Sequence, residues 1–259
     1  MATTSSESSQ GIKSIEVGAR VLLALERNRG PMTLSEVAAG SGMHPAKVHR
    51  YLTSLVRVGL ASQSVDTGLY DLGPASRRLG VEALRRNHAI AVTVPHAVAL
   101  RDATGHTVNA AVWSEEGPVI VRWEAGTHAL PIVIRVGSVL PLLDSAVGVV
   151  FYAYMPQERI ASVLHTQQQQ AATRSLSLAQ AQEIAATVRR DGYASTRDQM
   201  ILGLAALAAP VFGDDGSVEV VIGLITPTRV MSAGEAKRLA RELREAAGRA
   251  SRELGFADA

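Results

Sequence analysis

The sequence predicts an α+β protein with a small helical domain at its N-terminal end and a larger sheet domain after it. The chain has 259 residues, more than one small core needs, which favours two domains. Residues 33–70 show a helix, a glycine-rich turn, a second helix and a hairpin within about 40 residues. Residues 106–136 and 193–226 have strand patterns with hairpin connections and flanking helices, which is typical of an α+β sheet domain.

The composition is that of a soluble globular protein, with 47% hydrophobic and 19% charged residues. Cysteine is absent, which excludes disulfides, thiolate metal sites and cysteine nucleophiles and suits a reducing cytoplasm. Residues 1–11 are rich in serine and threonine and have no apolar core, so we expect a disordered leader and no signal peptide. No apolar run reaches membrane-spanning length, so we expect a cytoplasmic protein without a membrane partner.

A first helix is predicted over residues 12–27. Cations followed by Gly30-Pro31 end it, because cations suit the C-terminal end of a helix and proline stops its propagation. We expect this helix to cover the two that follow and to leave some apolar surface for a second subunit. Its apolar stripe is expected along Ile15, Ala19, Leu22, Leu23 and Leu25.

The next two helices form a predicted helix-turn-helix. Thr33 and Glu36 have the spacing of a capping box at the start of the first. Gly40-Ser41-Gly42 stops that helix, because glycine tolerates the left-handed conformation that such a turn requires. Pro45 suits the first turn of the second helix, where its missing N–H is no loss.

The second of these helices has two distinct sides. Val48, Leu52, Leu55 and Val56 fall on the side expected to be buried, while Ala46, Arg50, Thr53 and Arg57 fall opposite, with Lys47 and His49 between. A helix with a short, basic, hydrogen-bonding outer side is what a DNA major groove accepts. Any amphipathic helix has a solvated charged side, and that alternative is favoured for a lone helix. The order of helix, turn, helix and hairpin reverses the preference.

A wing is predicted after the helix-turn-helix, with strands over residues 60–64 and 69–72 and a turn at 65–68. The charge distribution agrees with nucleic-acid binding at this end: residues 1–90 hold 11 Lys/Arg against 7 Asp/Glu, or +4, whereas residues 91–259 hold 15 against 17, or −2. The expected partner is double-stranded operator DNA. The candidate DNA-binding residues are Thr33, Ser35, His44, Ala46, Lys47, His49, Arg50, Thr53, Arg57 and Tyr70.

Residues 74–87 predict a helical linker, with Leu79, Ala83 and Leu84 on its apolar side. Its outward arginines are equally compatible with phosphate contact and with a solvated connector. The domains are therefore placed at residues 12–73 for the winged helix-turn-helix, 74–88 for the linker and 89–259 for the sheet domain.

The sheet domain is predicted to contain six strands, one of them uncertain, and several helices. Asp144-Ser145 interrupts the apolar segment 139–154 as a helix N-terminus that either residue can cap. Residues 166–173 are expected to form a polar loop. The expected helices are 92–102, 156–164, 178–190 and 232–254, and the expected strands are 106–113, 118–125, 130–136, 193–198, 203–212 and 217–226.

The sheet domain shows no sign of catalysis. It has no phosphate loop, no metal-ligand spacing and no nucleophile elbow, and the chain's seven histidines are scattered. We therefore expect no catalytic residues, no metal and no cofactor, and a domain that holds a small molecule rather than transforming one. Two other classes stay open: a winged-helix protein-interaction module with a scaffold domain, and an enzyme with an appended DNA-binding module.

The chain resembles the IclR family of bacterial transcription regulators over about residues 12–255. The matching segments, in order, are SIEVGARVLLAL, TLSEVAAGSGMHPAKVHRYLTSLVRVGL, GLYDLGP, VGSVLPLLDSAVGVV, DGYASTRDQ and LAALAAPVFGDDGSV. The resemblance implies a winged helix-turn-helix, a linker helix and a C-terminal GAF-like effector-binding domain. It also implies homodimers, often paired into tetramers, on palindromic operators whose affinity a small-molecule effector controls.

This chain departs from the family where the resemblance places the effector site. The family's usual histidine and lysine fall at Leu143 and Val149, and its acidic residue falls at Thr196. A frequent cysteine falls at Ala206, and serines fall at Gly223 and Ile225. Since burying a carboxylate without donors is costly, we expect a larger, more apolar effector, with polar contacts from Asp144, Ser145, Thr196, Asp198 and Gln199. The candidate effector-binding residues are Trp113, Leu143, Asp144, Ser145, Ala146, Thr196, Asp198, Gln199, Ala206, Gly223 and Ile225.

Overall fold

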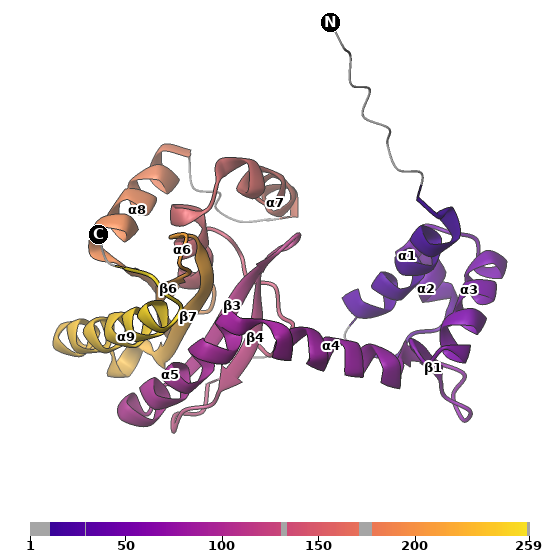
Figure 1. The fold of residues 1–259 in the computed structure, drawn as a ribbon, viewed down its shortest axis with the longest axis horizontal. Helices are drawn as coiled ribbons and strands as arrows, with labels where there is room; N and C mark the ends of the chain where they lie inside the picture. The colour runs from indigo at the N-terminus through magenta and orange to yellow at the C-terminus, as the bar shows by residue number, and fades with distance from the viewer. Residues whose placement is uncertain (1–10, 29, 131–133, 171–177, 258–259) are drawn as a thin grey trace, which may run out of the picture. The chain divides into compact units, whose positions relative to one another are not determined.

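The computed structural model describes residues 11–28, 30–130, 134–170 and 178–257 (Figure 1). The chain divides into two compact units, the first ending at Leu84 and the second beginning at Arg85. The predicted leader lies outside the described residues except for Gly11.

The N-terminal unit is a three-helix domain with a hairpin. It contains α1 (Lys13–Arg27), α2 (Leu34–Ser41), α3 (Pro45–Arg57), β1 (Ala61–Gln63) and β2 (Tyr70–Leu72), and the two strands pair antiparallel. The predicted helix-turn-helix and wing are therefore present. Its core is formed by Val21, Ala24, Leu25, Met32, Val37, Ala38, Val48, Leu52, Leu55, Ala61 and Tyr70.

The apolar stripe predicted for α1 is right at Leu25 and wrong at Ile15, Ala19 and Leu23, which are exposed. The helix buries Val17, Val21, Ala24 and Leu25, whereas Ile15 is 66% exposed. The helix carries apolar residues on two sides, and periodicity alone cannot say which side packs inward. The partner surfaces of α2 and α3 decide it: Leu25 lies in the core with Leu22 packed against it, whereas Ile15 lies on the outer side.

The helix caps agree with the sequence. Glu36 accepts a hydrogen bond from the Thr33 N–H at 2.7 Å, and the Thr33 hydroxyl accepts one from the Glu36 N–H at 3.3 Å, which confirms the capping box. These bonds from the Thr33 backbone and side chain lower the pKa of Glu36. Gly42 ends α2 at φ +66°, and Pro45 opens α3.

Two helices follow the wing. The predicted linker is α4 (Pro74–Arg86), which buries none of its residues. The next helix, α5 (His88–Thr104), begins four residues before its predicted start at residue 92 and continues through Pro95. The Asn87 side chain caps it by accepting a hydrogen bond from the Ile90 N–H at 3.0 Å, a start signal that the prediction overlooked.

The C-terminal unit is built on an antiparallel five-stranded sheet with the order β4-β3-β7-β6-β5. The predicted strand over residues 130–136 is wrong for its described part: Leu130 and residues 134–136 form no strand, and 131–133 lie outside the described residues. The strands are β3 (Thr107–Ser114), β4 (Gly117–Glu124), β5 (Ala194–Arg197), β6 (Leu204–Phe212) and β7 (Val218–Pro227).

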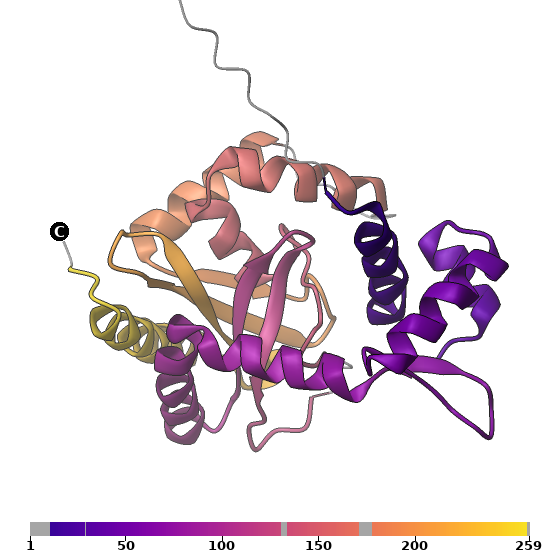
Figure 2. The same cartoon turned by 45° about the vertical axis from the view of Figure 1, so that its right-hand side comes forward.

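Helices cover both faces of this sheet (Figure 2). Helices α5 and α9 (Ala233–Glu253) pack on one face, while α6 (Ala146–Tyr154) and α8 (Leu178–Asp191) belong to the core on the other. The short 3-10 helix Thr228–Val230 precedes α9. Within the described ranges, no helix has both the length and the apolar character needed to cross a membrane.

Helix α7 (Gln157–Gln170) corrects the predicted polar loop over residues 166–173. The helix continues through the glutamines, and residues 171–173 lie outside the described chain. Glutamine is a good helix former, and the polar composition that suggested a loop equally suits an exposed helix end.

Candidate nucleic-acid interface and ligand cavity

Helix α3 has the two sides that its sequence predicts. Val48 and Leu52 are completely buried, and Leu55 is nearly so. Ala46, Lys47, His49, Arg50, Thr53 and Arg57 are all exposed. Lys47, Arg50 and Arg57 form no ion pair with any residue in the described parts of the chain, so their charges are available to an anionic partner.

The N-terminal half of α3 offers a hollowed polar surface. His44 caps the helix, with its Nδ1 accepting a hydrogen bond from the Ala46 N–H at 3.4 Å. The Thr53 hydroxyl donates to the His49 carbonyl at 2.9 Å and keeps a lone pair for a further donor. A hollow of about 710 Å³ is lined by His44, Ala46, Lys47, Arg50, Tyr51 and Ser54.

Two of the predicted DNA-binding residues have structural roles. Tyr70 is only 4% exposed and belongs to the core, which corrects its assignment as a DNA contact. Its hydroxyl lies 3.5 Å from Nδ1 of His49, so it supports the outer side of α3 from beneath. The Thr33 hydroxyl is committed to the capping box, while Ser35 is exposed on α2.

The wing contributes no positive charge. Residues 60–73 contain Asp66 and Asp71 but no lysine or arginine. Val65 stands 99% exposed at the tip, beside a turn that is closed by a hydrogen bond from the Gly68 N–H to the Ser64 carbonyl at 2.9 Å. Among the described residues of this unit, the cations that could hold DNA therefore come from its helices.

Four of the predicted effector residues lie on one face of the sheet. Thr196 on β5 pairs with Ala206 on β6, which pairs with Ile225 on β7. Gly223 occupies the neighbouring row, where it pairs with Asn109 on β3. Three consecutive strands, β5, β6 and β7, thus bring these positions together beneath α6 and α8.

A cavity of about 360 Å³ lies next to these residues, and we call it the α8 cavity. Of the predicted effector residues, Leu143, Thr196 and Gln199 line it. Its walls contain two acidic residues, Glu183 and Asp191, and no lysine or arginine. The complete lining is Leu143, Val149, Glu183, Ile184, Thr187, Val188, Asp191, Tyr193, Ala194, Ser195, Thr196 and Gln199.

Two of the expected polar contacts are committed to the backbone. Ser145 is buried and caps α6, with its hydroxyl accepting from the Gly148 N–H at 2.9 Å and donating to the Pro141 carbonyl at 2.6 Å. Asp198 is exposed at φ +53°, and its carboxylate accepts a hydrogen bond from the Gly203 N–H at 2.7 Å. Ser145 therefore holds a helix start and Asp198 holds a turn, and a ligand contact from either residue stays a prediction.

The other predicted effector residues lie outside the α8 cavity. Trp113 lines a separate hollow of about 510 Å³ with Ser114, Glu115, Arg159 and Ser162, and its ring packs 5.6 Å from that of Phe151. Ala146 is buried in the first turn of α6, and Asp144 is half-buried just before it.

Sequence reasoning missed the part of the cavity that α8 supplies. Ile184, Thr187 and Val188 line it, but nothing in the sequence of α8 indicates which side faces a ligand. Asn109 was also missed: it is 2% exposed, and its Oδ1 has no hydrogen-bond partner among the residues that the structure describes. A Cβ on Gly223 would lie 2.7 Å from that oxygen, so glycine makes room for the amide. An asparagine within an apolar strand was the available signal.

No cluster of three His, Cys, Asp or Glu side chains that could hold a metal ion occurs among the residues described.

Two family models match the chain. The model described as IclR helix-turn-helix domain matches residues 14–64, and the model described as Bacterial transcriptional regulator IclR C-terminal matches residues 81–252. Together they span α1 to the first wing strand β1, and nearly all of the sheet domain.

Full-length relatives agree with these models. The chain is 28% identical to the DNA-binding transcriptional repressor YiaJ of Escherichia coli K12, over 95% of this chain and 89% of that protein. The crystal structure of Pseudomonas aeruginosa HmgR is 31% identical, with a TM-score of 0.61 and coverage of 96% and 100%. An IclR regulator structure from Alicyclobacillus acidocaldarius is 25% identical, with a TM-score of 0.81 and coverage of 95% and 100%.

Proposed function

The chain belongs to the IclR family of bacterial transcriptional regulators and is a ligand-responsive DNA-binding regulator, and from this premise we propose which of its residues read DNA and which hold the effector. In this proposal α3 enters the major groove of an operator, and the α8 cavity binds a comparatively apolar, uncharged small molecule. The protein acts by binding and carries out no reaction on its effector.

The outer side of α3 is the observation that supports DNA reading most directly. Ala46 is small enough to let the helix approach the base edges, and Arg50 one turn later can reach a guanine edge with two hydrogen bonds. Lys47 stands at the shoulder of the helix and suits a phosphate. Because the wing has no cation, we propose that it contacts DNA by shape or polar groups and that α3 supplies most of the charge.

The charge of the α8 cavity supports an uncharged effector. Glu183 would repel a ligand carboxylate, and no lysine or arginine in the lining would offset this repulsion, while the charge of Asp191 is already paired with Arg190. Burying an unpaired charge is unfavourable, whereas burying an apolar group is favourable, so we propose that the cavity selects against small keto acids. Ile184, Val149 and Leu143 supply apolar surface, while Thr196, Thr187 and Gln199 supply hydrogen bonds that orient the ligand.

Dimerisation is proposed through the outer side of α1. Ile12, Ile15 and Leu23 are between 48% and 66% exposed, an apolar surface that a monomer gains nothing by displaying. A two-fold dimer would present two copies of α3 to a palindromic operator. The effector can change operator affinity only through its different affinities for the DNA-competent and incompetent arrangements, and the linker α4 is the element proposed to connect them.

The proposed DNA interface is tested by fluorescence-anisotropy titration with the DNA upstream of the protein's own gene, at two salt concentrations. We expect specific binding that weakens steeply with salt, and weaker binding in Arg50→Ala. Arg249→Ala is the matched control, because it removes the same charge from an exposed position on α9 in the other unit. Weak binding that ignores sequence and is equal in all three proteins would point instead to a protein-interaction module.

A further inference from the structure

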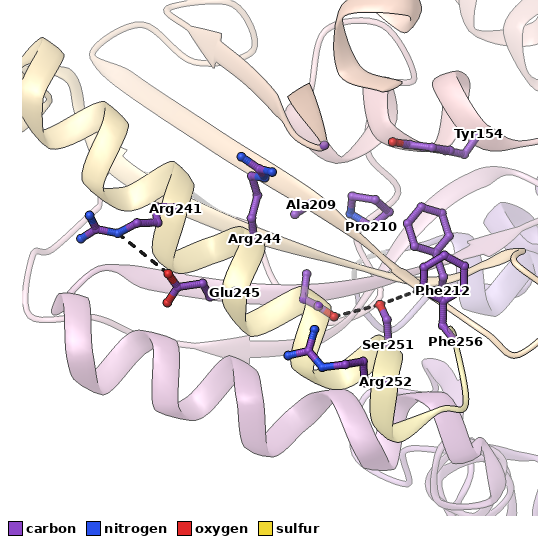
Figure 3. A pocket seen from close by; sticks show the side chains of 13 residues that line it. Tyr154, Ala209, Pro210, Phe212, Arg241, Arg244, Glu245, Ser251, Arg252 and Phe256 are labelled. Carbon is purple, nitrogen blue, oxygen red and sulfur yellow. Dashed lines mark hydrogen bonds and ion pairs between the residues drawn. The ribbon is translucent and has the colours of Figure 1, made fainter. Parts of the chain in front are cut away.

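A second cavity lies on the α9 side of the sheet domain, and we call it the α9 cavity (Figure 3). Its volume is about 420 Å³, within the range of small-molecule sites. It is bounded by α9, by the end of β6, by Tyr154 at the end of α6 and by Gly192. The lining is Tyr154, Gly192, Ala209, Pro210, Phe212, Arg241, Arg244, Glu245, Ala247, Gly248, Ser251, Arg252 and Phe256.

The α9 cavity is separate from the α8 cavity. The two share no lining residue, and they lie on either side of the turn at residues 191–193: Asp191 and Tyr193 line the α8 cavity, whereas Gly192 lines the α9 cavity. The two also differ in charge. Three arginines and one glutamate line the α9 cavity, for a net +2, whereas the α8 cavity has two acidic residues and no cation.

Two of these arginines have hydrogen-bond donors that can bind an anion, although Arg244 also interacts electrostatically with Asp191. Arg244 and Arg252 have no hydrogen bond or ion pair to a side chain among the described residues, while Arg241 forms only a loose pair with Glu245 at 3.9 Å. Nε of Arg244 lies 3.2 Å from where a Cβ on Gly192 would stand, so this side chain crosses from α9 to the turn. An arginine whose donors make no hydrogen bond to another side chain offers its planar fork to a carboxylate.

Glycine at position 248 opens the cavity between these arginines. Gly248 lies in the interior of the 21-residue helix α9, four residues from both Arg244 and Arg252. Glycine destabilises a helix interior relative to alanine, so its presence there needs a reason in packing or function. A Cβ at this position would already lie 3.4 Å from Nη1 of Arg252, which shows that the arginine folds back over the glycine.

Aromatic rings form the opposite end of the cavity. The rings of Tyr154 and Phe212 meet edge to face with centroids 5.1 Å apart, and those of Phe212 and Phe256 are 4.9 Å apart (Figure 3). The edge of β6 beside them is already satisfied: Pro210 has no N–H, and the Phe212 N–H donates to the Ser251 hydroxyl at 3.0 Å. The cavity therefore presents rings and arginines, not unpaired backbone.

We propose that the α9 cavity is a second ligand site that takes an aromatic carboxylate. The carboxylate lies between Arg244 and Arg252 above Gly248, and the ring packs against Phe212 and Tyr154. This site goes beyond the proposed effector pocket, and its charge selects the class of ligand that the α8 cavity rejects.

Isothermal titration of the full-length protein with sodium benzoate tests this proposal. We expect saturable binding of benzoate, and at least about tenfold weaker binding of benzamide, which lacks the charge, and of acetate, which lacks the ring. Arg244→Gln should weaken benzoate binding at least about tenfold, and Gly248→Leu should abolish it by filling the space between the arginines. Circular dichroism verifies that both variants fold.

Arg249→Gln is the matched control, since Arg249 is exposed on the same helix but does not line the cavity. It should bind benzoate like the unchanged protein. The proposal is overturned if benzoate does not bind, if benzamide binds equally well, or if Arg244→Gln and Arg249→Gln behave alike. It is also overturned if sedimentation shows that Arg244→Gln changes the oligomeric state while benzoate has no effect, because the cavity would then be a contact between copies of the chain.

Discussion

Helix α3 and the α8 cavity each present a surface to a partner, but they are assembled in opposite ways. The outer side of α3 comes from 13 consecutive residues and carries Lys47, Arg50 and Arg57 with no acidic residue. The α8 cavity is built from residues between Leu143 and Gln199 on separate elements, and it holds two carboxylates and no cation. One surface suits a polyanion and can be recognised from local periodicity, whereas the other suits an uncharged ligand and exists only once the chain has folded.

The largest effect is expected on the buried side of α3. Replacing a core residue there should unfold the helix that carries the exposed DNA-binding side chains. Leu52→Ala should lower the free energy of unfolding by about 2–5 kcal/mol, because Leu52 is completely buried. Urea unfolding followed by circular dichroism measures this. Thr53 is the next residue and lies on the exposed side of α3, so Thr53→Ala should change the free energy of unfolding by less than about 0.5 kcal/mol. Equal effects would show that the two sides of α3 are assigned wrongly.

On the outer side of α3, Arg50→Ala should cost roughly 1–3 kcal/mol of operator binding and relax specificity at one base pair. Lys47→Ala should weaken binding to all sequences and reduce the slope of affinity against salt by about one. Anisotropy titrations over a salt series separate the two outcomes. Unchanged binding in both variants would mean that another surface of the unit reads DNA.

In the sheet domain, Gly223→Ala should close the space above Asn109. The new Cβ would lie 2.7 Å from the Asn109 Oδ1 and 3.0 Å from a methyl group of Val147, so we expect a loss of roughly 1–3 kcal/mol in unfolding free energy. Gly234→Ala is the control, because its Cβ would meet only the Ser232 hydroxyl at 4.0 Å. If the two variants unfold at the same urea concentration, the Asn109 amide moves aside at no cost in stability.

Substitutions at the adjacent residues Asp144 and Ser145 test which of the two caps helix α6. Ser145→Ala should cost about 1 kcal/mol of stability, because it removes the acceptor for the Gly148 N–H. Asp144→Ala should change stability by less than about 0.5 kcal/mol, since the described structure gives its carboxylate no hydrogen bond. Thermal unfolding of both proteins decides which residue caps α6, and the reverse order would restore Asp144 as the cap.

The smallest effect concerns His106, which is 5% exposed at the start of β3. Burial lowers its pKa, and nearby His128 adds to this, while Glu235 opposes it at 3.7 Å. The folded state therefore favours the neutral ring, so stability is full above the ordinary pKa of about 6.5 and falls as the pH drops below it. His106→Gln should flatten this dependence in urea unfolding at pH about 8 and about 5.5. An unchanged dependence would assign it to other groups.

The DNA-binding unit was predicted well where the structure depends on neighbours in sequence. The Thr33–Glu36 cap, the glycine turn and the two sides of α3 all follow from spacing along a few turns. The prediction fails where a residue's partner lies elsewhere: α1 is apolar on two sides, and only its packing against α2 and α3 shows that Ile15 faces outward. Tyr70 resembles a surface aromatic until Met32 and the core surround it.

The sheet domain shows the same limit more strongly. Its strands follow from local patterns, but Leu130 and residues 134–136 were mistaken for parts of a strand because apolar residues also occur in irregular segments. Thr196, Ala206 and Gly223 meet only through the register of three strands. The resemblance to a family placed them together, yet it could not show that Ser145 and Asp198 were committed to the backbone or that α8 brings Ile184 to the cavity.

The central claim is that binding of an uncharged ligand in the α8 cavity changes the affinity of the protein for operator DNA. The most direct test is operator anisotropy with a panel of small keto acids and of larger apolar metabolites, in the unchanged protein and in Ile184→Trp, which fills the cavity. Ala186→Trp, exposed on the same helix outside the lining, is the control. We predict that an apolar ligand shifts operator affinity by about 5–150-fold and that Ile184→Trp alone abolishes the shift. A shift produced only by small keto acids, or one that survives Ile184→Trp, would contradict the claim.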